Sequence, residues 1–167
     1  MATAVMVLNT LVTDTWNAQL DESLSLAARL SVAVKSRAYH FRLSFLLWKI
    51  NGRISRFFQD VDDLLSGKRM PAANLEPATP EGIQKSVSSL IELGTSFNRI
   101  YEEARRKRLL NNSLIAGPIA ALRTHAEQFF ELAEWLDLIR CGEDVERIFA
   151  RAAEERRRGD VYDLSQV

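Results

Sequence analysis

Apolar residues recur along this chain at the spacing of helices that pack lengthwise, most clearly over residues 113–139. There they follow one another in alternating steps of four and three, as Ile115, Ile119, Leu122, Ala126, Phe129, Ala133 and Leu136. Such steps average about 3.5 residues, the repeat of a helix that packs along other helices. Leu132, Trp135 and Ile139 form a second row that widens the apolar face. The pattern predicts a helix that touches neighbours over most of its circumference, as the central member of a bundle.

A second ladder of the same kind begins after Thr79-Pro80-Glu81, which is a favourable helix start. It combines a capping hydroxyl, a proline at the first helical position and an acid near the positive end of the helix dipole. The ladder itself consists of Ile83, Val87, Leu90, Gly94, Phe97, Tyr101 and Ala104. Gly94 lies in the apolar seam, where it costs about 1 kcal/mol relative to Ala. Its presence there predicts that a bulky aromatic side chain approaches the backbone closely.

The N-terminal third of the chain is also expected to be helical, because residues 1–51 contain neither Gly nor Pro. The apolar spacing predicts helix over 15–66, with one break between Ser36 and Gly52. Residues 1–14 are expected to form either a short helix or an apolar arm. Residues 67–79 contain Pro71 and Pro77 and are the predicted linker, while 143–159 form a short last helix and 160–167 a tail.

The predicted fold is therefore all-α: a single domain of four to five long antiparallel helices, spanning residues 1–167. No strand-like alternation with regular turn signals is present to suggest a sheet. One point is left open by the sequence. At Gly117-Pro118, either the fourth helix starts at the proline, or its first turn precedes the proline and is kinked.

Composition narrows the function by exclusion. The chain has 22 Lys and Arg residues against 22 Asp and Glu residues, so its formal net charge is zero. Zero net charge gives no global reason to bind nucleic acid, and it weakly favours self-association. The basic runs 105–108 and 156–158 follow acids by one helical turn, which is typical of self-neutralising helix ends. No apolar run approaches the about 20 residues that a membrane-spanning helix needs.

Two features of the chain bear on the cellular compartment in which the protein is expected. Cys141 is the only cysteine, so neither an intramolecular disulfide nor a thiolate metal cluster can form. The first twenty residues lack the basic region of a secretory signal. A cytoplasmic location is therefore expected.

Candidate catalytic residues are few. Neither His40 nor His125 has an acid three residues before it, so the Glu-x-x-His pairs of di-iron bundles are missing. Helical ribonucleases of the HEPN class carry Arg followed by His four to six residues later. Arg37 and His40 have these residue types with only two residues between them, and Arg37, His40 and His125 are retained as a candidate polar site. Phosphate-binding glycine patterns and a Gly-x-Ser-x-Gly elbow are missing too, and no cofactor is predicted.

The aromatic residues are more informative. Residues 38–48 are apolar on nearly all sides except at His40, Arg42 and Ser44, which is more apolar surface than one core needs. The adjacent pairs Phe57-Phe58 and Phe129-Phe130 are expected to point different ways, with one member of each facing a second layer, a partner or a pocket. The candidate interface therefore consists of Phe41, Phe45, Trp48, Phe58 and Phe130.

The leading functional prediction is a non-catalytic bundle that acts through protein–protein contact. It is expected to self-associate as a homodimer, or else to bind another protein. Two alternatives are kept. The first is a bundle that binds a small apolar ligand in a cavity beside Gly94. The second is a toxin–antitoxin component or helical nuclease. Residues 154–167 (EERRRGDVYDLSQV) resemble the C-terminal ends of bacterial antitoxins, in which a helix ends in Gly and an apolar-acidic strip follows.

Overall fold

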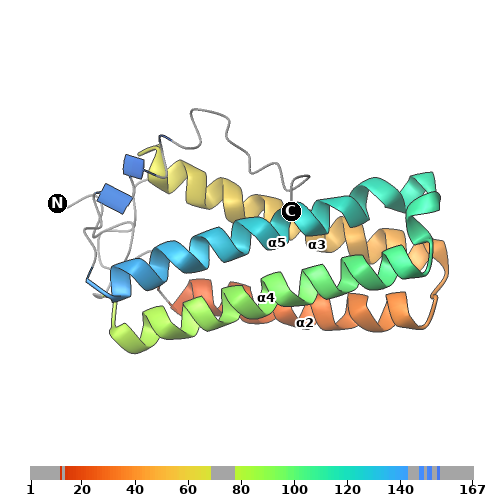
Figure 1. Cartoon of the computed structure of the whole chain (residues 1–167), viewed down its shortest axis with the longest axis horizontal. Coiled ribbons are helices and arrows are strands. Elements are labelled where there is room, and N and C mark those ends of the chain that lie inside the picture. The colour runs from red at the N-terminus through yellow and green to blue at the C-terminus, as the bar shows by residue number, and fades with distance from the viewer. Residues whose placement is uncertain are drawn as a thin grey trace.

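The computed structural model describes residues 12, 14–68, 78–142, 147, 148, 150, 151 and 154. Within them it shows four long helices and one short 3₁₀ turn and no strand, which confirms the all-α bundle. The helices are α2 (Asp14–Lys35), α3 (His40–Leu65), α4 (Pro80–Arg106) and α5 (Ser113–Arg140), with η1 (Leu109–Asn111) before α5 (Figure 1). The predicted N-terminal arm, most of the last helix and the tail lie outside the described residues.

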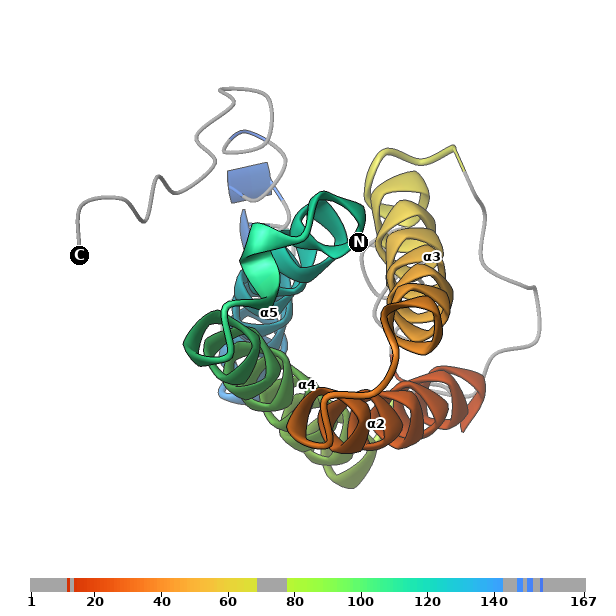
Figure 2. The same cartoon turned by 90° about the vertical axis from the view of Figure 1, so that its right-hand side faces the viewer.

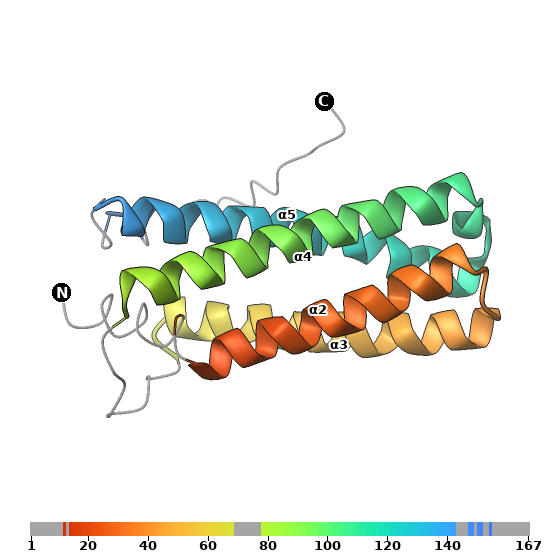
Figure 3. The same ribbon diagram turned by 90° about the horizontal axis from the view of Figure 1, so that it is seen from below.

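The four helices stand at the corners of a square, in the spatial order α2, α3, α5, α4 (Figure 2). Helices that follow one another in the sequence run in opposite directions, while α2 and α4 run side by side in the same direction (Figure 3). The linker after α3 therefore joins two helices at opposite corners. The prediction that residues 113–139 form the central member of the bundle is wrong, because α5 packs on α3 and α4 and lies diagonal to α2.

The core forms where the predicted ladders meet. Every residue of both apolar rows in α5 is buried, and so is the α4 ladder except for the half-buried Tyr101. Four aromatic rings contact one another at the centre of this core. Phe129 lies with its ring centroid 5.6 Å from that of Phe97, 5.1 Å from Phe58 and 6.1 Å from Phe57. The core thus draws on rings from α3, α4 and α5.

The helix boundaries follow local chemistry. Thr79 caps α4, its side-chain oxygen accepting a hydrogen bond from the Gly82 N–H at 3.0 Å, as the sequence predicted. Asn112 caps α5 in the same way, accepting from the Leu114 N–H at 2.9 Å. The N-terminal helix breaks once, at residues 36–39, inside the predicted window, and it runs through Asn51-Gly52 without interruption.

Gly94 has the predicted role. A Cβ atom placed on Gly94 would lie 2.8 Å from two ring atoms of Phe130, closer than packed carbon atoms approach. The missing side chain of α4 therefore makes room for an aromatic ring of α5, and this pair of helices approaches closely. Because the ring of Phe130 fills the space beside Gly94, the expected ligand cavity is not found there.

Candidate functional site

The outer face of α3 carries a line of exposed aromatic side chains, which we call the aromatic stripe. Phe41, Phe45 and Trp48 are 87%, 53% and 70% exposed, and their spacing of four and three residues puts them on one face of the helix. The rings of Phe45 and Trp48 contact each other, with centroids 6.1 Å apart. The opposite face of α3 is in the core, so the N-terminal half of this helix is apolar on both sides. A helix with apolar residues all round is normally buried.

A line of cations runs beside the aromatic stripe, and we call it the basic stripe. Arg42, Lys49 and Arg56 recur every seven residues, so they share one side of α3, and all three are exposed. No ion pair is recorded between any of them and the part of the chain that the structure describes. Arg53 is different, because it forms an ion pair with Glu22 and donates to Ser23 Oγ at 3.2 Å, fastening α3 to α2. Among the described residues, the basic stripe therefore has no acidic partner of its own.

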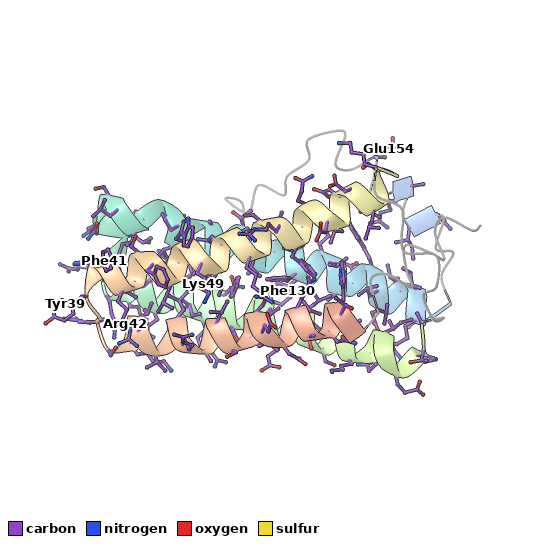
Figure 4. The ribbon with its side chains drawn as sticks, turned by 180° about the vertical axis from the view of Figure 1, so that it is seen from behind. Tyr39, Phe41, Arg42, Lys49, Phe130 and Glu154 are labelled. Atoms are coloured by element: carbon purple, nitrogen blue, oxygen red, sulfur yellow. The ribbon has the colours of Figure 1, made fainter. Side chains whose placement is uncertain are left out.

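The aromatic stripe, with Arg42 and Lys49 of the basic stripe, lies toward one end of the bundle, where α2 and α4 finish and α3 and α5 begin. The labelled Tyr39, Phe41, Arg42 and Lys49 lie on this side of the molecule, and Tyr39 projects from the tip (Figure 4). Arg56 lies past the middle of α3. Lys107 ties the helix ends together, since its ammonium group donates to the backbone oxygens of Val34 and Lys35. The stripes are thus presented on a braced part of the fold.

The other two interface candidates lie elsewhere. Phe58 is only 6% exposed and packs against Phe129 and His125, so its assignment to an interface is wrong. Phe57 and Phe58 are both buried because α3 has neighbours on two sides, and Phe57 contacts Trp16 of α2. Phe130 is partly exposed, but it belongs to the contact between α4 and α5 and lies apart from the aromatic stripe.

The candidate polar site is not assembled by the fold. Arg37 lies in the connection between α2 and α3 with a left-handed backbone (φ 49°), so it does not share a helical face with His40. His125 stacks on Phe58, which follows His40 by eighteen residues of one helix, or about 27 Å along its axis. These three side chains therefore cannot act on one substrate atom, and a nuclease built on Arg37 and His40 loses its geometric basis.

His125 is a structural residue in the core. Its side chain is buried, it stacks on the Phe58 ring, and its Nδ1 is hydrogen-bonded to Oε1 of Gln128 at 3.0 Å. Burial lowers the pKa of His125 below its ordinary value of 6.5, and the hydrogen bond to Gln128 offsets part of that effect. The imidazole is therefore neutral in the folded chain at neutral pH.

This environment predicts a pH dependence of stability. As the pH falls below 6.5, the unfolded chain takes up the His125 proton before the folded chain does, so the free energy of unfolding decreases. Urea midpoints measured between pH 7.5 and pH 5.5 should fall for the wild type and fall less for His125→Phe, which keeps a flat ring beside Phe58. His40→Gln is the control, because His40 is exposed, and it should behave like the wild type. Equal pH dependence in all three would contradict the assignment.

Other kinds of site find little support in the described ranges. No group of three His, Cys, Asp or Glu side chains in them could hold a metal ion. None of their helices is both long and apolar enough to cross a bilayer. A depression between the start of α4 and the end of α5 is open to solvent and lined mainly by polar and charged side chains: Pro80, Glu81, Gln84, Lys85, Ser88 and Arg140.

The sequence did not single out two exposed side chains at the end of the bundle that carries the aromatic stripe. Tyr39 is 90% exposed where it caps α3, and Leu114 is exposed at the start of α5. The basic stripe was missed as well, although a signal was present. Residues 35–59 contain six Lys and Arg residues and no Asp or Glu, a local excess that the zero net charge conceals.

Comparison with known proteins adds no family to this picture: no family model, no curated protein and no solved structure matches the chain.

Proposed function

We propose that this chain is a non-catalytic helical bundle that acts by binding protein, and that the aromatic stripe of α3 is its contact surface. The observation that carries the proposal is the exposure of Phe41, Phe45 and Trp48 at helical spacing on the outside of a finished core. Exposed apolar patches rimmed by polar residues mark interaction surfaces. Aromatic side chains supply much of the energy of protein interfaces.

The spacing of the stripe favours a helical partner. Phe41 and Trp48 are seven residues apart, which is about 10 Å along α3. A partner helix with apolar residues at the same intervals would pack lengthwise on the stripe, as helices pack within this bundle. The partner is either a second copy of this chain or a different protein, met in the cytoplasm that the single cysteine favours.

The proposal is tested through Trp48, whose fluorescence reports directly on the stripe. The other tryptophans, Trp16 and Trp135, are buried, so changes in acrylamide quenching on binding come mainly from Trp48. A synthetic helical peptide with a Leu stripe at this spacing and Gln elsewhere should protect Trp48 from acrylamide and shift its emission to the blue. The double variant Phe41→Ser/Phe45→Ser should lose this response.

Val32→Ser is the matched control, because Val32 is an exposed apolar residue on α2 that is not part of the stripe. It should bind the peptide like the wild type. Sedimentation equilibrium on the wild type and the stripe variant asks whether a second copy is the partner. If the wild type neither self-associates nor binds the peptide through Trp48, the proposal is wrong.

A further inference from the structure

The charges of this neutral chain are separated along the bundle. Near one end lie the exposed cations Lys35, Arg37, Arg42, Lys49 and Arg108. The opposite end of α3 carries Asp60, Asp62 and Asp63. Acids are present at the basic end, but Glu102 and Glu103 form ion pairs with Arg105, Arg106 and Lys107 of their own helix. The aromatic stripe therefore lies in a region of positive potential, which attracts negative partners.

Two of these cations occupy positions that are unfavourable for arginine. Arg37 and Arg108 have left-handed backbones, with φ of 49° and 58°, directly after the ends of α2 and α4. Hydrogen bonds from Arg37 N to Val34 O and from Ala38 N to Ala33 O close a helix end that normally carries glycine. Glycine adopts this conformation freely, whereas other residues are strained in it. Arg37 lies in the connection that leads into α3, beside the start of both stripes, and a strained arginine at this place suggests that its charge has a use. Arg108 follows α4, at the corner of the bundle diagonal to α3.

The same charge pattern argues against a second copy on the stripe. In a symmetric dimer the same patch of both copies meets across the twofold axis. Arg42 and Lys49 would then approach the same cations of the partner, and like charges at an interface are unfavourable. The stripe suits a partner that brings negative charge.

The arrangement of the two stripes favours an acidic protein partner over two other negatively charged partners, single-stranded nucleic acid and a lipid surface. Single-stranded nucleic acid is bound by aromatic rings whose faces are free for base stacking. Here the rings of Phe45 and Trp48 are tilted by 35° with centroids 6.1 Å apart, so each covers part of the other and they do not form a flat stacking platform. Both stripes follow helical intervals, the aromatic one at four and three residues and the basic one at seven. A helix can match these intervals along its length, whereas a lipid surface has no such register.

Resting on the proposed function, we infer that the partner is an acidic amphipathic helix. Its apolar side packs on Phe41, Phe45 and Trp48, and its carboxylates lie beside Arg42, Lys49 and Arg56. Arg37 extends the positive field past the start of α3. In coiled coils, charges that flank the apolar seam select the partner in the same way.

Three synthetic peptides with one Leu stripe test this inference, with Glu, Gln or Lys at the flanking positions. Affinity is read from the protection of Trp48 against acrylamide. We expect the Glu peptide to bind about tenfold more tightly than the Gln peptide, as about three exposed ion pairs allow. The Lys peptide should bind more weakly than either. The advantage of the Glu peptide should shrink as salt is raised, because salt screens exposed charges.

The left-handed arginines provide a second, independent readout. Arg37→Gly should raise the urea midpoint while weakening the Glu peptide two- to fivefold, by roughly the energy of one exposed pair. Arg108→Gly should raise the urea midpoint as well but change the affinity for the Glu peptide little, because α4 lies diagonal to α3. Arg37→Lys is the matched control, because it keeps both the charge and the backbone strain. It should bind like the wild type without any gain in stability. A purely structural role for Arg37 would leave peptide affinity unchanged in the glycine variant.

The outcomes separate the two proposals. If all three peptides bind equally, the aromatic stripe is a docking surface and the inference about charge is wrong. If none binds, both are wrong. Vesicles of phosphatidylserine and phosphatidylcholine and a single-stranded oligouridine are tested in parallel. Stronger protection of Trp48 by either of these than by the Glu peptide would overturn the acidic-helix inference.

Discussion

Replacing Phe129 by alanine is expected to destabilise the bundle by about 3–5 kcal/mol, the usual cost of removing a buried phenylalanine ring. Phe129 is fully buried, and its ring contacts those of Phe57, Phe58 and Phe97. The substitution leaves a cavity where three helices meet, and neighbours on rigid helices can only partly fill it. The free energy of unfolding of a domain of this kind is about 5–15 kcal/mol, so the substitution should remove a large part of it. Urea unfolding followed by circular dichroism measures the effect.

The matched control is Phe41→Ala, which removes the same ring from a side chain that is 87% exposed. Its urea midpoint should stay close to that of the wild type, because almost no buried contact is lost. Similar losses for the two variants would mean that the stripe is covered in the free protein, for example by a second copy. The comparison therefore tests the core and the exposure of the stripe together.

The positions of the buried residues could be predicted from the sequence. The four-three ladder in α5 and most of that in α4 proved to be buried, because on a helix such spacing has one geometric meaning. The cap at Thr79 followed from side-chain chemistry that is local to a few residues. The close approach at Gly94 followed from the cost of glycine within a helix.

The arrangement of the helices around the square could not be predicted. Periodicity shows which face of a helix is buried, but it does not identify the neighbour. The wide apolar face of α5 suggested a central position. A helix at a corner of the square needs an equally wide apolar face, because it contacts one neighbour on each of two sides and the shared core between them. The same geometry explains Phe58, since α3 buries side chains against both α2 and α5.

The candidate site was half predicted. The aromatic stripe was visible as surplus apolar residues around Phe45 and Trp48, because a second apolar face on one helix shows in the sequence. Its electrostatic setting was concealed by the zero net charge, although the six cations without an acid over residues 35–59 were a local sign of it. Which helices share the positive end of the bundle shows only when the helices are placed. The strain at Arg37 and Arg108 depends on backbone conformation, and no residue pattern reveals it.

Replacing Pro118 by alanine is expected to stabilise the bundle, by about 2–3 kcal/mol. The helix α5 begins at Ser113, so Pro118 lies beyond the first turn, where proline costs a helix about 3 kcal/mol. Proline has no N–H for the carbonyl of Leu114, and alanine would restore that hydrogen bond. The contact of this residue with α3 should survive, because Asn51 Nδ2 donates to the backbone oxygen of residue 118 at 2.9 Å.

Pro80→Ala is the matched control, measured by the same urea unfolding. Pro80 is the first residue of α4, where proline fits the helix and its missing N–H would have no helical partner. Alanine there should leave the stability unchanged or lower it slightly. A gain at position 118 with none at position 80 would show that Pro118 strains α5 in place. A loss at position 118 would show instead that the packing of α5 on α3 depends on the bend that proline imposes, and that this bend is a requirement of the fold.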